Sequence, residues 1–170
     1  MGEQIIEVDE QNNVIGLRPR EDFYTGDYIH RSVQLVLFNA DDEILLQHRS
    51  ATKKWFPNLY SYSVSGTVGD ESYEICMARE LQEELGLDIP ITKVFEFPFF
   101  HEADKSWHAL FTAKSDLPIT LDNIEMQAIR WISGQALAAD IELHPERYTP
   151  PMVAGMKKFF SHQGDRAQKN

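Results

Sequence analysis

The most informative stretch of the chain is Arg79-Glu80-Leu81-Gln82-Glu83-Glu84-Leu85-Gly86-Leu87. An α-helix turns by about 100° per residue, so Glu80, Glu83 and Glu84 fall within an arc of about 100° on one face. Carboxylates this close repel one another and raise each other's pKa unless a cation lies among them. Oxygen donors of this kind suit Mg²⁺ or Mn²⁺ rather than Zn²⁺, which prefers His and Cys. Arg79 precedes Glu83 by one helical turn, so it can pair with this carboxylate and orient it.

The alternative interpretation is a solvated, glutamate-rich helix face held together by i,i+4 ion pairs. At typical frequencies of roughly 6–7% for Arg, Glu and Gly, five fixed positions match by chance in about one window in a million. We therefore interpret residues 79–87 as a functional motif.

Helical signals surround this motif. Ser72 is suited to be an N-cap and Gly86 to be a C-cap, so the sequence predicts a helix between them. The predicted apolar stripe, on the side away from the carboxylates, consists of Ile75, Ala78, Leu81 and Leu85. Cys76 lies in the same helix and is interpreted as a packing residue rather than a nucleophile.

The rest of the chain predicts mainly strands. Apolar runs predict strands at residues 5–8, 14–17, 30–38, 44–48, 60–65, 94–100, 107–112 and 128–132. Turn-forming residues separate the strand at residues 5–8 from that at 14–17, and the strand at 30–38 from that at 44–48. This pattern predicts two hairpins. Ser133 predicts a short helix to residue 139, and Pro150-Pro151 predicts a last helix. The side chains expected to face inward from that last helix are Met152, Val153, Met156 and Phe159. Strands with one central helix and one or two later ones predict a mixed α/β sandwich.

Composition narrows the possible partners. The chain has 170 residues, 42% of them apolar, which is enough for one domain with a sizeable core. Its 16 basic and 27 acidic side chains give a net charge of −11, which argues against a nucleic acid polymer as partner. No apolar run approaches the length of a membrane span, and the acidic start lacks signal-peptide features. One cysteine fits a reducing compartment, so we expect a cytoplasmic protein that does not bind membranes. A homodimer is expected only because it is the commonest assembly of soluble proteins.

The motif also resembles a known signature, the Nudix box. In that pattern seven residues separate a glutamate from the Arg-Glu pair, and seven residues likewise lie between Glu71 and Arg79. The pattern also has five residues between a glycine and that glutamate, whereas here only four residues separate Gly66 from Glu71. We interpret this as a loop that is one residue short, with Gly66 continuing the preceding strand. Because the family uses a backbone carbonyl near this glycine as a metal ligand, the departure puts that one ligand in doubt.

The resemblance extends over most of the chain. The stretches at residues 45–49, 56–59 and 130–131 are similar to the isopentenyl-diphosphate-isomerase-like branch of the Nudix superfamily. It implies an α/β fold, specifically a Nudix-type α/β/α sandwich with a mixed β-sheet and an N-terminal β-hairpin extension. We expect a single domain at residues 1–162, with the extension at residues 1–29 and a flexible tail at residues 163–170.

That branch contains true isomerases and diphosphate hydrolases. The isomerase cysteine corresponds to Ser65, and two metal-binding histidines correspond to Thr67 and Phe23. A third histidine corresponds to His30, and the later acidic region, residues 104–107, has no glutamate at the matching place. The isomerases keep only the last helix glutamate, whereas this chain has the full set. We therefore favour a hydrolase over the alternatives, an isopentenyl-diphosphate delta-isomerase or a non-catalytic nucleotide-binding Nudix domain.

The resemblance implies a Mg²⁺-dependent hydrolase, with Mn²⁺ as the alternative ion, that cleaves the diphosphate of a nucleoside diphosphate derivative or another organic diphosphate. The implied metal ligands are Glu80, Glu83 and Glu84. One of them, such as Glu83, or alternatively Glu125, accepts a proton from water. Glu71 supports the site and Arg79 orients the carboxylates. Glu125 is equally well explained as a solvent-facing loop residue.

Substrate contacts are expected outside the box. Arg49 and Lys53 correspond to phosphate-binding positions of the branch, and isolated surface charges are the alternative. His30 is a further candidate, although it could equally be a strand residue hydrogen-bonded at the sheet edge. The aromatic residues Trp55, Trp107, Phe99 and Phe100 could stack a base, but aromatic residues in strands are more often core. The sequence does not identify the substrate among organic diphosphates.

Overall fold

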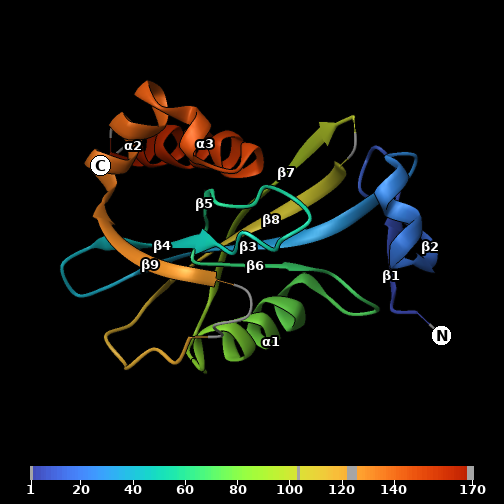
Figure 1. Cartoon of the computed structure of the whole chain (residues 1–170), viewed down its shortest axis with the longest axis horizontal. Coiled ribbons are helices and arrows are strands. Elements are labelled where there is room, and N and C mark those ends of the chain that lie inside the picture. Colours follow the sequence, from blue (N-terminus) through green and yellow to red (C-terminus); the bar gives the residue numbers. More distant parts are fainter. Residues whose placement is uncertain (1, 103, 122–125, 168–170) are drawn as a thin grey trace.

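The computed structural model describes residues 2–102, 104–121 and 126–167, with side chains to Gly164. Within these residues one nine-stranded sheet carries α1 (Tyr73–Leu85) on one face (Figure 1). Helices α2 (Gly134–Leu143) and α3 (Pro150–Ala167) cover the other face. The strands are β1 (Gln4–Val8), β2 (Val14–Pro19), β3 (Ile29–Phe38), β4 (Glu43–Arg49), β5 (Tyr60–Ser61), β6 (Val64–Thr67), β7 (Thr92–His101), β8 (Asp104–Lys114) and β9 (Met126–Ser133). Short 3₁₀ helices are η1 (Arg20–Thr25) and η2 (Pro145–Arg147). The predicted α/β/α sandwich is confirmed.

Strand β3 organises the sheet. It pairs in parallel with β8 from His30 to Phe38, and antiparallel with β1, β4 and β6. The outer pairs β1–β2, β4–β9 and β7–β8 are antiparallel. The sheet is therefore mixed, as the sequence predicts, and the N-terminal hairpin β1–β2 joins it through β1.

Alternation along β3 divides the interior into two cores. Val33, Leu35 and Leu37 pack toward α1, whereas Val36 packs in a second cluster with residues of α2 and α3. Ser32 and Gln34, which alternate with these residues, are buried but polar. Since successive side chains on a strand point to opposite faces, Ser32 and Gln34 lie on the same face as Val36.

Helix α1 begins and ends where the sequence predicts. The Ser72 hydroxyl accepts a hydrogen bond from the Ile75 amide, and Gly86 adopts the left-handed conformation at φ 68°. The predicted apolar stripe was partly wrong, because Ala78 is exposed and Ile75 is 61% exposed. The buried face instead consists of Tyr73, Cys76, Met77, Leu81, Glu84 and Leu85. This face follows i,i+4 spacing from Tyr73, which the sequence stripe had missed.

The single strand predicted at residues 60–65 is two strands. β5 pairs with β4, whereas β6 pairs with β3. Ser63 lies between them, and its hydroxyl donates to the Leu45 carbonyl at 2.7 Å and accepts from the Leu37 amide at 2.9 Å. The chain thus crosses from one neighbour to the other through a buried serine.

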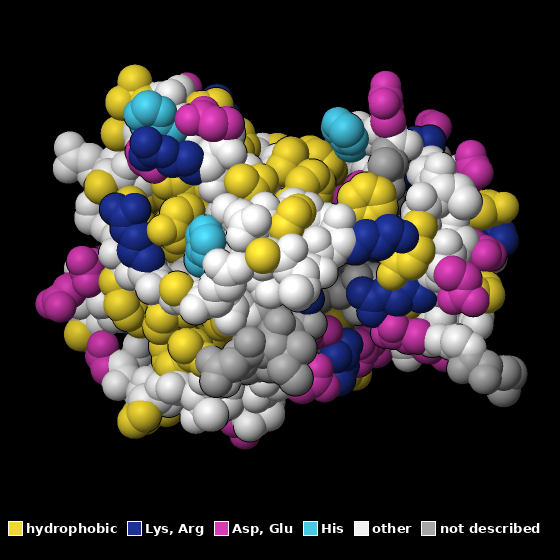
Figure 2. Space-filling model, viewed as in Figure 1, with side chains coloured by type: hydrophobic (Ala, Val, Ile, Leu, Met, Phe, Trp, Pro, Cys, Tyr) yellow, Lys and Arg dark blue, Asp and Glu magenta, His cyan; other side chains and the backbone are white. Residues whose placement is uncertain are grey.

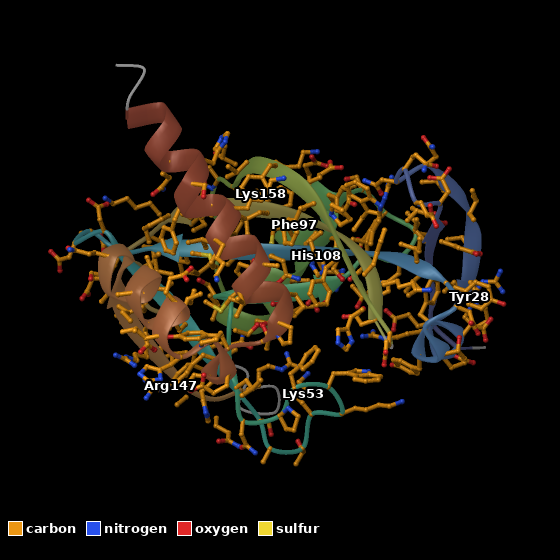
Figure 3. The ribbon with its side chains drawn as sticks, turned by 90° about the horizontal axis from the view of Figure 1, so that it is seen from above. Tyr28, Lys53, Phe97, His108, Arg147 and Lys158 are labelled. Carbon is orange, nitrogen blue, oxygen red and sulfur yellow. The ribbon has the colours of Figure 1, made fainter. Side chains whose placement is uncertain are left out.

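The last helix is longer than predicted. α3 continues to Ala167, so residues 163–167 of the predicted flexible tail are helical. Seen from above, α3 crosses the sheet over Phe97 and His108 (Figure 3). None of the helices in the described part of the chain is long and apolar enough to cross a membrane.

Candidate functional site

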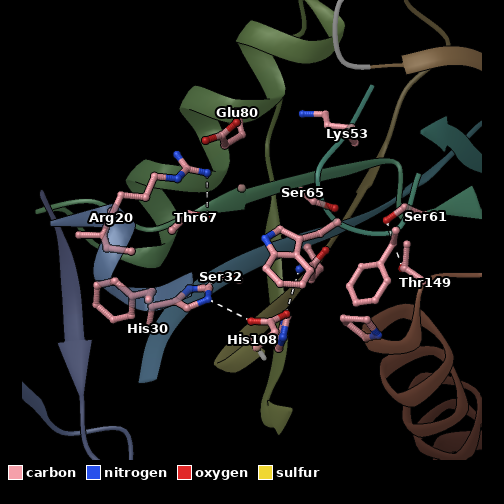
Figure 4. A pocket seen from close by; sticks show the side chains of 18 of the residues that line it. Arg20, His30, Ser32, Lys53, Ser61, Ser65, Thr67, Glu80, His108 and Thr149 are labelled. Atoms are coloured by element: carbon pink, nitrogen blue, oxygen red, sulfur yellow. Dashed lines mark hydrogen bonds and ion pairs between the residues drawn. The ribbon is translucent and has the colours of Figure 1, made fainter. Parts of the chain in front are cut away.

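A cavity of about 460 Å³ opens where the N-terminal segment, the loop at residues 50–59 and α1 meet the sheet (Figure 4). Its acidic side is formed by Glu80 and Glu83 of α1, and its basic side chains include Arg20, Arg49, Lys53 and Arg79. Its floor is formed by polar residues of the central strands, among them Gln34 and His108. In Figure 2, basic and hydrophobic side chains lie beside one another where the N-terminal segment meets the rest of the molecule.

Glu80 lies against the backbone of β6. A Cβ atom placed on Gly66 would come within 2.6 Å of the Glu80 Oε1 atom, so any larger residue would force the Glu80 side chain to move. This gives Gly66 a packing role, in agreement with its interpretation as a strand residue. It also shows that the short loop still brings the glycine to the carboxylate side of α1.

Arg79 lies among three carboxylates. Its Nη1 atom is 2.8 Å from Glu80 Oε1 and 3.2 Å from Glu83 Oε2, and its Nη2 atom is 2.7 Å from Glu71 Oε1. The hydrogen bond to Glu71, followed by the charge of Glu80, raises the pKa of Arg79, although burial acts in the opposite direction. The predicted orienting contact between Arg79 and Glu83 is therefore present. Glu71, which is not among the residues that line the cavity, holds the guanidinium from behind.

Glu84 differs from its two neighbours. It is only 4% exposed, and it accepts a hydrogen bond of 2.5 Å from Gln47 Nε2 on β4. It is not among the described residues that line the cavity. The structure thus brings Glu80 and Glu83 together at the cavity wall and turns Glu84 toward the sheet, so its metal-binding role stays a prediction.

The basic side chains approach the cavity from different elements. Arg49 of β4 donates to the Trp55 carbonyl at 2.9 Å and to the Phe56 carbonyl at 3.2 Å, so it orders the loop. Lys53 comes from that loop. Arg20 comes from η1, where its Nη1 atom lies 2.7 Å from Glu3 and its Nη2 atom donates to Thr67 Oγ1 at 3.5 Å.

The sequence predicted Arg49 and Lys53, and the structure brings both to the cavity. Arg20 was missed, because nothing in the sequence links residue 20 to the motif at residues 79–87. The signal that could have found it is the position of an arginine directly after a predicted hairpin.

A hydrogen-bonded chain crosses the cavity floor. His30 Nε2 lies 3.2 Å from Asp104 Oδ1, and the Ser106 hydroxyl donates to the same oxygen at 3.4 Å. Gln34 Nε2 donates to His108 Nδ1 at 2.9 Å, so the ring proton is on Nε2, which donates to Ser106 Oγ at 2.8 Å. His30 therefore lines the cavity, but it also has the structural partner that the alternative interpretation required.

Two titratable residues of the floor, His108 and Asp104, have shifted pKa values. Burial lowers the pKa of His108 to about 3, so the imidazole carries no charge at neutral pH. Burial acts to raise the pKa of Asp104, but the hydrogen bond and positive charge of His30 outweigh it, and the pKa is lowered. His108 therefore adds no charge to the cavity at neutral pH, whereas Asp104 is ionised.

The donor set fits a Mg²⁺ ion. The described residues contain no group of three or more His, Cys, Asp or Glu side chains arranged to hold a metal. Glu80 and Glu83 nevertheless offer hard oxygen donors at the cavity wall. In proteins Mg²⁺ is often held by one or two carboxylates, with substrate phosphates and water completing its coordination. Glu125, the remaining acidic candidate, lies outside the described residues.

The other candidates divide between core and cavity. Cys76 is fully buried in the core beneath α1, which confirms its packing role. Trp107 packs against the same core, while Phe99 and Phe100 lie on β7 and do not line the cavity. Among these aromatic candidates, only Trp55 lines it.

Comparisons with known proteins agree with this geometry. A family model described as the NUDIX domain matches residues 28–152. The chain is 43% identical over 160 residues to the prenyl-diphosphate phosphatase of Methanosarcina mazei, which covers 92% of this chain and 94% of that protein. It is 30% identical over 159 residues to an uncharacterized Nudix hydrolase of Pseudomonas aeruginosa, with 92% and 93% covered.

Solved structures show the same fold. The crystal structure of DR0079 from Deinococcus radiodurans gives a TM-score of 0.79 at 24% identity and covers 92% of this chain and 98% of that one. The NUDIX domain of NrtR from Shewanella oneidensis, solved with ADP ribose, gives a TM-score of 0.61 at 19% identity, with 79% and 88% covered. The isomerase-like branch is not singled out by these comparisons and stays a prediction.

Proposed function

The chain belongs to the Nudix domain family and is a Nudix hydrolase, and from this premise we propose that it hydrolyses a prenyl diphosphate with the help of Mg²⁺. Water attacks one phosphorus of the P–O–P bridge, and the bridging oxygen leaves with the other phosphate. The products are a prenyl monophosphate and inorganic phosphate. Prenyl diphosphates are organic diphosphates, one of the two substrate classes expected from the sequence.

The observation that carries this proposal is the similarity to the Methanosarcina mazei prenyl-diphosphate phosphatase, at 43% identity over 92% of the chain. The cavity is chemically suited to such a substrate. Arg20, Arg49 and Lys53 supply positive charge for the diphosphate, in a molecule whose net charge is −11. Aromatic side chains at the same cavity supply apolar surface for a hydrocarbon group.

We assign the residues as follows. Glu80 and Glu83 hold the ion at the cavity wall, and Arg79 and Glu71 keep these carboxylates in position. When bound, Mg²⁺ offsets the negative charge of the diphosphate oxygens, which otherwise resist attack by water. Glu83 is 57% exposed and accepts the proton of the attacking water, with Glu125 as the alternative base. A homodimer and a cytoplasmic location stay predictions.

Phosphate release from a substrate panel tests this proposal. The panel contains dimethylallyl, geranyl, farnesyl and isopentenyl diphosphates, each with and without Mg²⁺, and cleavage of ADP ribose, which releases no inorganic phosphate, is followed by the formation of AMP. We expect Mg²⁺-dependent release from the prenyl diphosphates, and a loss of about 10²-fold or more in kcat for Glu83→Gln, because this carboxylate acts on the ion and the water.

The matched control is Glu74→Gln. Glu74 lies on the same helix but pairs with Lys93 and does not line the cavity, so this variant should keep wild-type kcat. No release from any prenyl diphosphate would refute the proposed substrate. Equal kcat in wild type and Glu83→Gln would refute the proposed site.

A further inference from the structure

The cavity mouth contains aromatic side chains that neither core uses. Tyr24, Trp55 and Phe56 line the cavity, and none belongs to either hydrophobic cluster of the described residues. Large aromatic side chains are normally buried in a core, because they remove the most apolar area from water. Their place at an open cavity beside cationic groups therefore indicates a binding role.

Two of them face each other from separate segments. The Tyr24 ring of η1 and the Trp55 ring of the loop lie 6.5 Å apart and are tilted by 40°. Lys54 Nζ lies 3.9 Å from the centre of the Tyr24 ring and 5.6 Å from that of Trp55. Tyr24 remains 41% exposed in spite of these contacts. We call Tyr24 and Trp55 the aromatic clasp.

The loop half of the clasp is held in a defined conformation. Phe56 adopts a left-handed backbone at φ 52°, which is unfavourable for a bulky residue. The Arg49 guanidinium donates to the carbonyls of Trp55 and Phe56, and these bonds stabilise the conformation. Because Arg49 is also one of the basic side chains that line the cavity, it connects these basic side chains to the clasp.

The other half comes from outside the common domain. The family model begins at residue 28, whereas Tyr24 precedes it. Substrate choice that differs among members of one family must depend on features beyond their shared chemistry. The aromatic clasp is such a feature, because Tyr24 lies in the N-terminal segment, outside the residues that the family model matches.

We propose that the aromatic clasp, Tyr24 and Trp55, binds the hydrocarbon chain of the substrate and makes the enzyme prefer longer prenyl groups. This inference rests on the proposed function. The diphosphate is held at the basic and acidic side of the cavity, and the chain leaves along the two rings. A tilted pair of rings suits a flexible hydrocarbon, whereas a flat nucleobase stacks best between parallel faces.

The first experiment measures kcat/KM for dimethylallyl, geranyl and farnesyl diphosphates. In the wild type we expect kcat/KM to rise with chain length, mainly through KM, because each added methylene is removed from water. Trp55→Gln should lower the farnesyl-to-dimethylallyl ratio roughly tenfold, equivalent to about 1.4 kcal/mol. Trp55→Leu should keep more of that ratio than Trp55→Gln does, because leucine has a size similar to that of glutamine but an apolar surface. Tyr24→Ala should lower the ratio as well.

The control variant is Phe100→Ala. Phe100 is 46% exposed on β7 and does not line the cavity, so its removal should leave the ratio within about twofold. An unchanged ratio in Trp55→Gln and Tyr24→Ala would overturn the proposal. That outcome includes an equal loss of kcat/KM for all three substrates, which would indicate that the rings shape the phosphate site.

A binding experiment separates this inference from the proposed function. Methylene diphosphonate and its farnesyl ester cannot be hydrolysed, so calorimetry with Mg²⁺ reports binding whether or not the enzyme cleaves prenyl diphosphates. In the wild type we expect the farnesyl ester to bind more tightly than methylene diphosphonate itself. The ratio of the two affinities should fall roughly tenfold in Trp55→Gln. No advantage in the wild type would overturn the inference. So would a Trp55→Gln defect confined to ADP ribose, which would assign the rings to a base.

Discussion

The buried histidine of the cavity floor shows how one residue ties the site to stability. His108 stacks on Phe97 with ring centres 5.1 Å apart, and both of its ring nitrogens are hydrogen-bonded, to Gln34 and Ser106. Protonation would put a second proton on Nδ1, where Gln34 already donates, and a charge where little water reaches. The neutral ring is therefore part of the folded state, although the sequence offers no sign that this histidine is buried.

We predict that the protein loses stability in mild acid through His108. Its pKa falls from 6.5 in the unfolded chain to about 3 in the fold, so between these values the unfolded chain binds more protons. The contribution of His108 to the free energy of unfolding is therefore fully present above pH 6.5 and is lost as the pH falls toward 3. Between pH 6.5 and about pH 4 we expect the free energy of unfolding to fall by up to about 3 kcal/mol. Urea unfolding at a series of pH values measures this loss.

His108→Gln should remove most of this slope, because glutamine has no titrating group. Asp104→Asn is a useful comparison, since the lowered pKa of Asp104 gives a loss of the same sign but only at still lower pH, below the ordinary aspartate value of 3.8. A wild-type slope that persists unchanged in His108→Gln would contradict the assignment.

Among the elements, α3 shows how closely a helix can approach the sheet. A Cβ atom on Gly155 would lie 2.7 Å from Phe97 Cζ and closer still to the Tyr62 hydroxyl. Glycine at this position lets the helix pack directly on both rings. This contact holds the start of α3, with Thr149 and Pro151, against the cavity.

We predict that Gly155→Ala destabilises the protein by about 1–3 kcal/mol, because α3 must move away from two buried rings. Gly164→Ala in the same helix has the opposite expected sign. No heavy atom lies within 4 Å of the Cβ position at Gly164, so alanine should stabilise the helix by up to about 1 kcal/mol. Thermal unfolding of both variants measures the difference. A Gly155→Ala variant as stable as the wild type would show that the packing at this point is loose.

At the scale of the whole molecule, the N-terminal segment is part of the domain rather than an appendage. Strand β1 pairs with β3 and places Ile6 and Val8 in the core beneath α1. The Ile6 amide also donates to the Val68 carbonyl at 3.3 Å, next to β6. The same segment supplies Arg20 and Tyr24 to the cavity. Residues that precede the family match at residue 28 therefore contribute both to the core and to the lining of the cavity.

We predict that a chain comprising residues 28–170 does not fold stably. The truncation removes the buried side chains of Ile5, Ile6, Val8 and Phe23. Each contributes about 1.5–3 kcal/mol by burial, and together they approach the typical net stability of a domain, about 5–15 kcal/mol. Circular dichroism during heating should show no cooperative transition. A cooperative transition near that of the full chain would show that the segment is dispensable for folding.

Much of this protein followed from its sequence because the signals are local. The spacing of Arg79 and Glu83 predicts their contact, since helix geometry determines which side chains lie together. Caps at Ser72 and Gly86 likewise define α1 without reference to the rest of the chain. The α/β sandwich was predicted from the order of strands and helices, and its mixed sheet from the resemblance to the Nudix superfamily.

Tertiary structure alone decided which of these groups share a site. Glu84 follows Glu83 directly, yet it turns to Gln47 of β4, because the buried face of α1 is set by the sheet on which it packs. Arg20 and Tyr24 reach the cavity because β1 pairs with β3, a contact between segments that no local pattern specifies. Local spacing determines the chemistry that each element carries, whereas long-range pairing and burial determine which elements meet around the cavity.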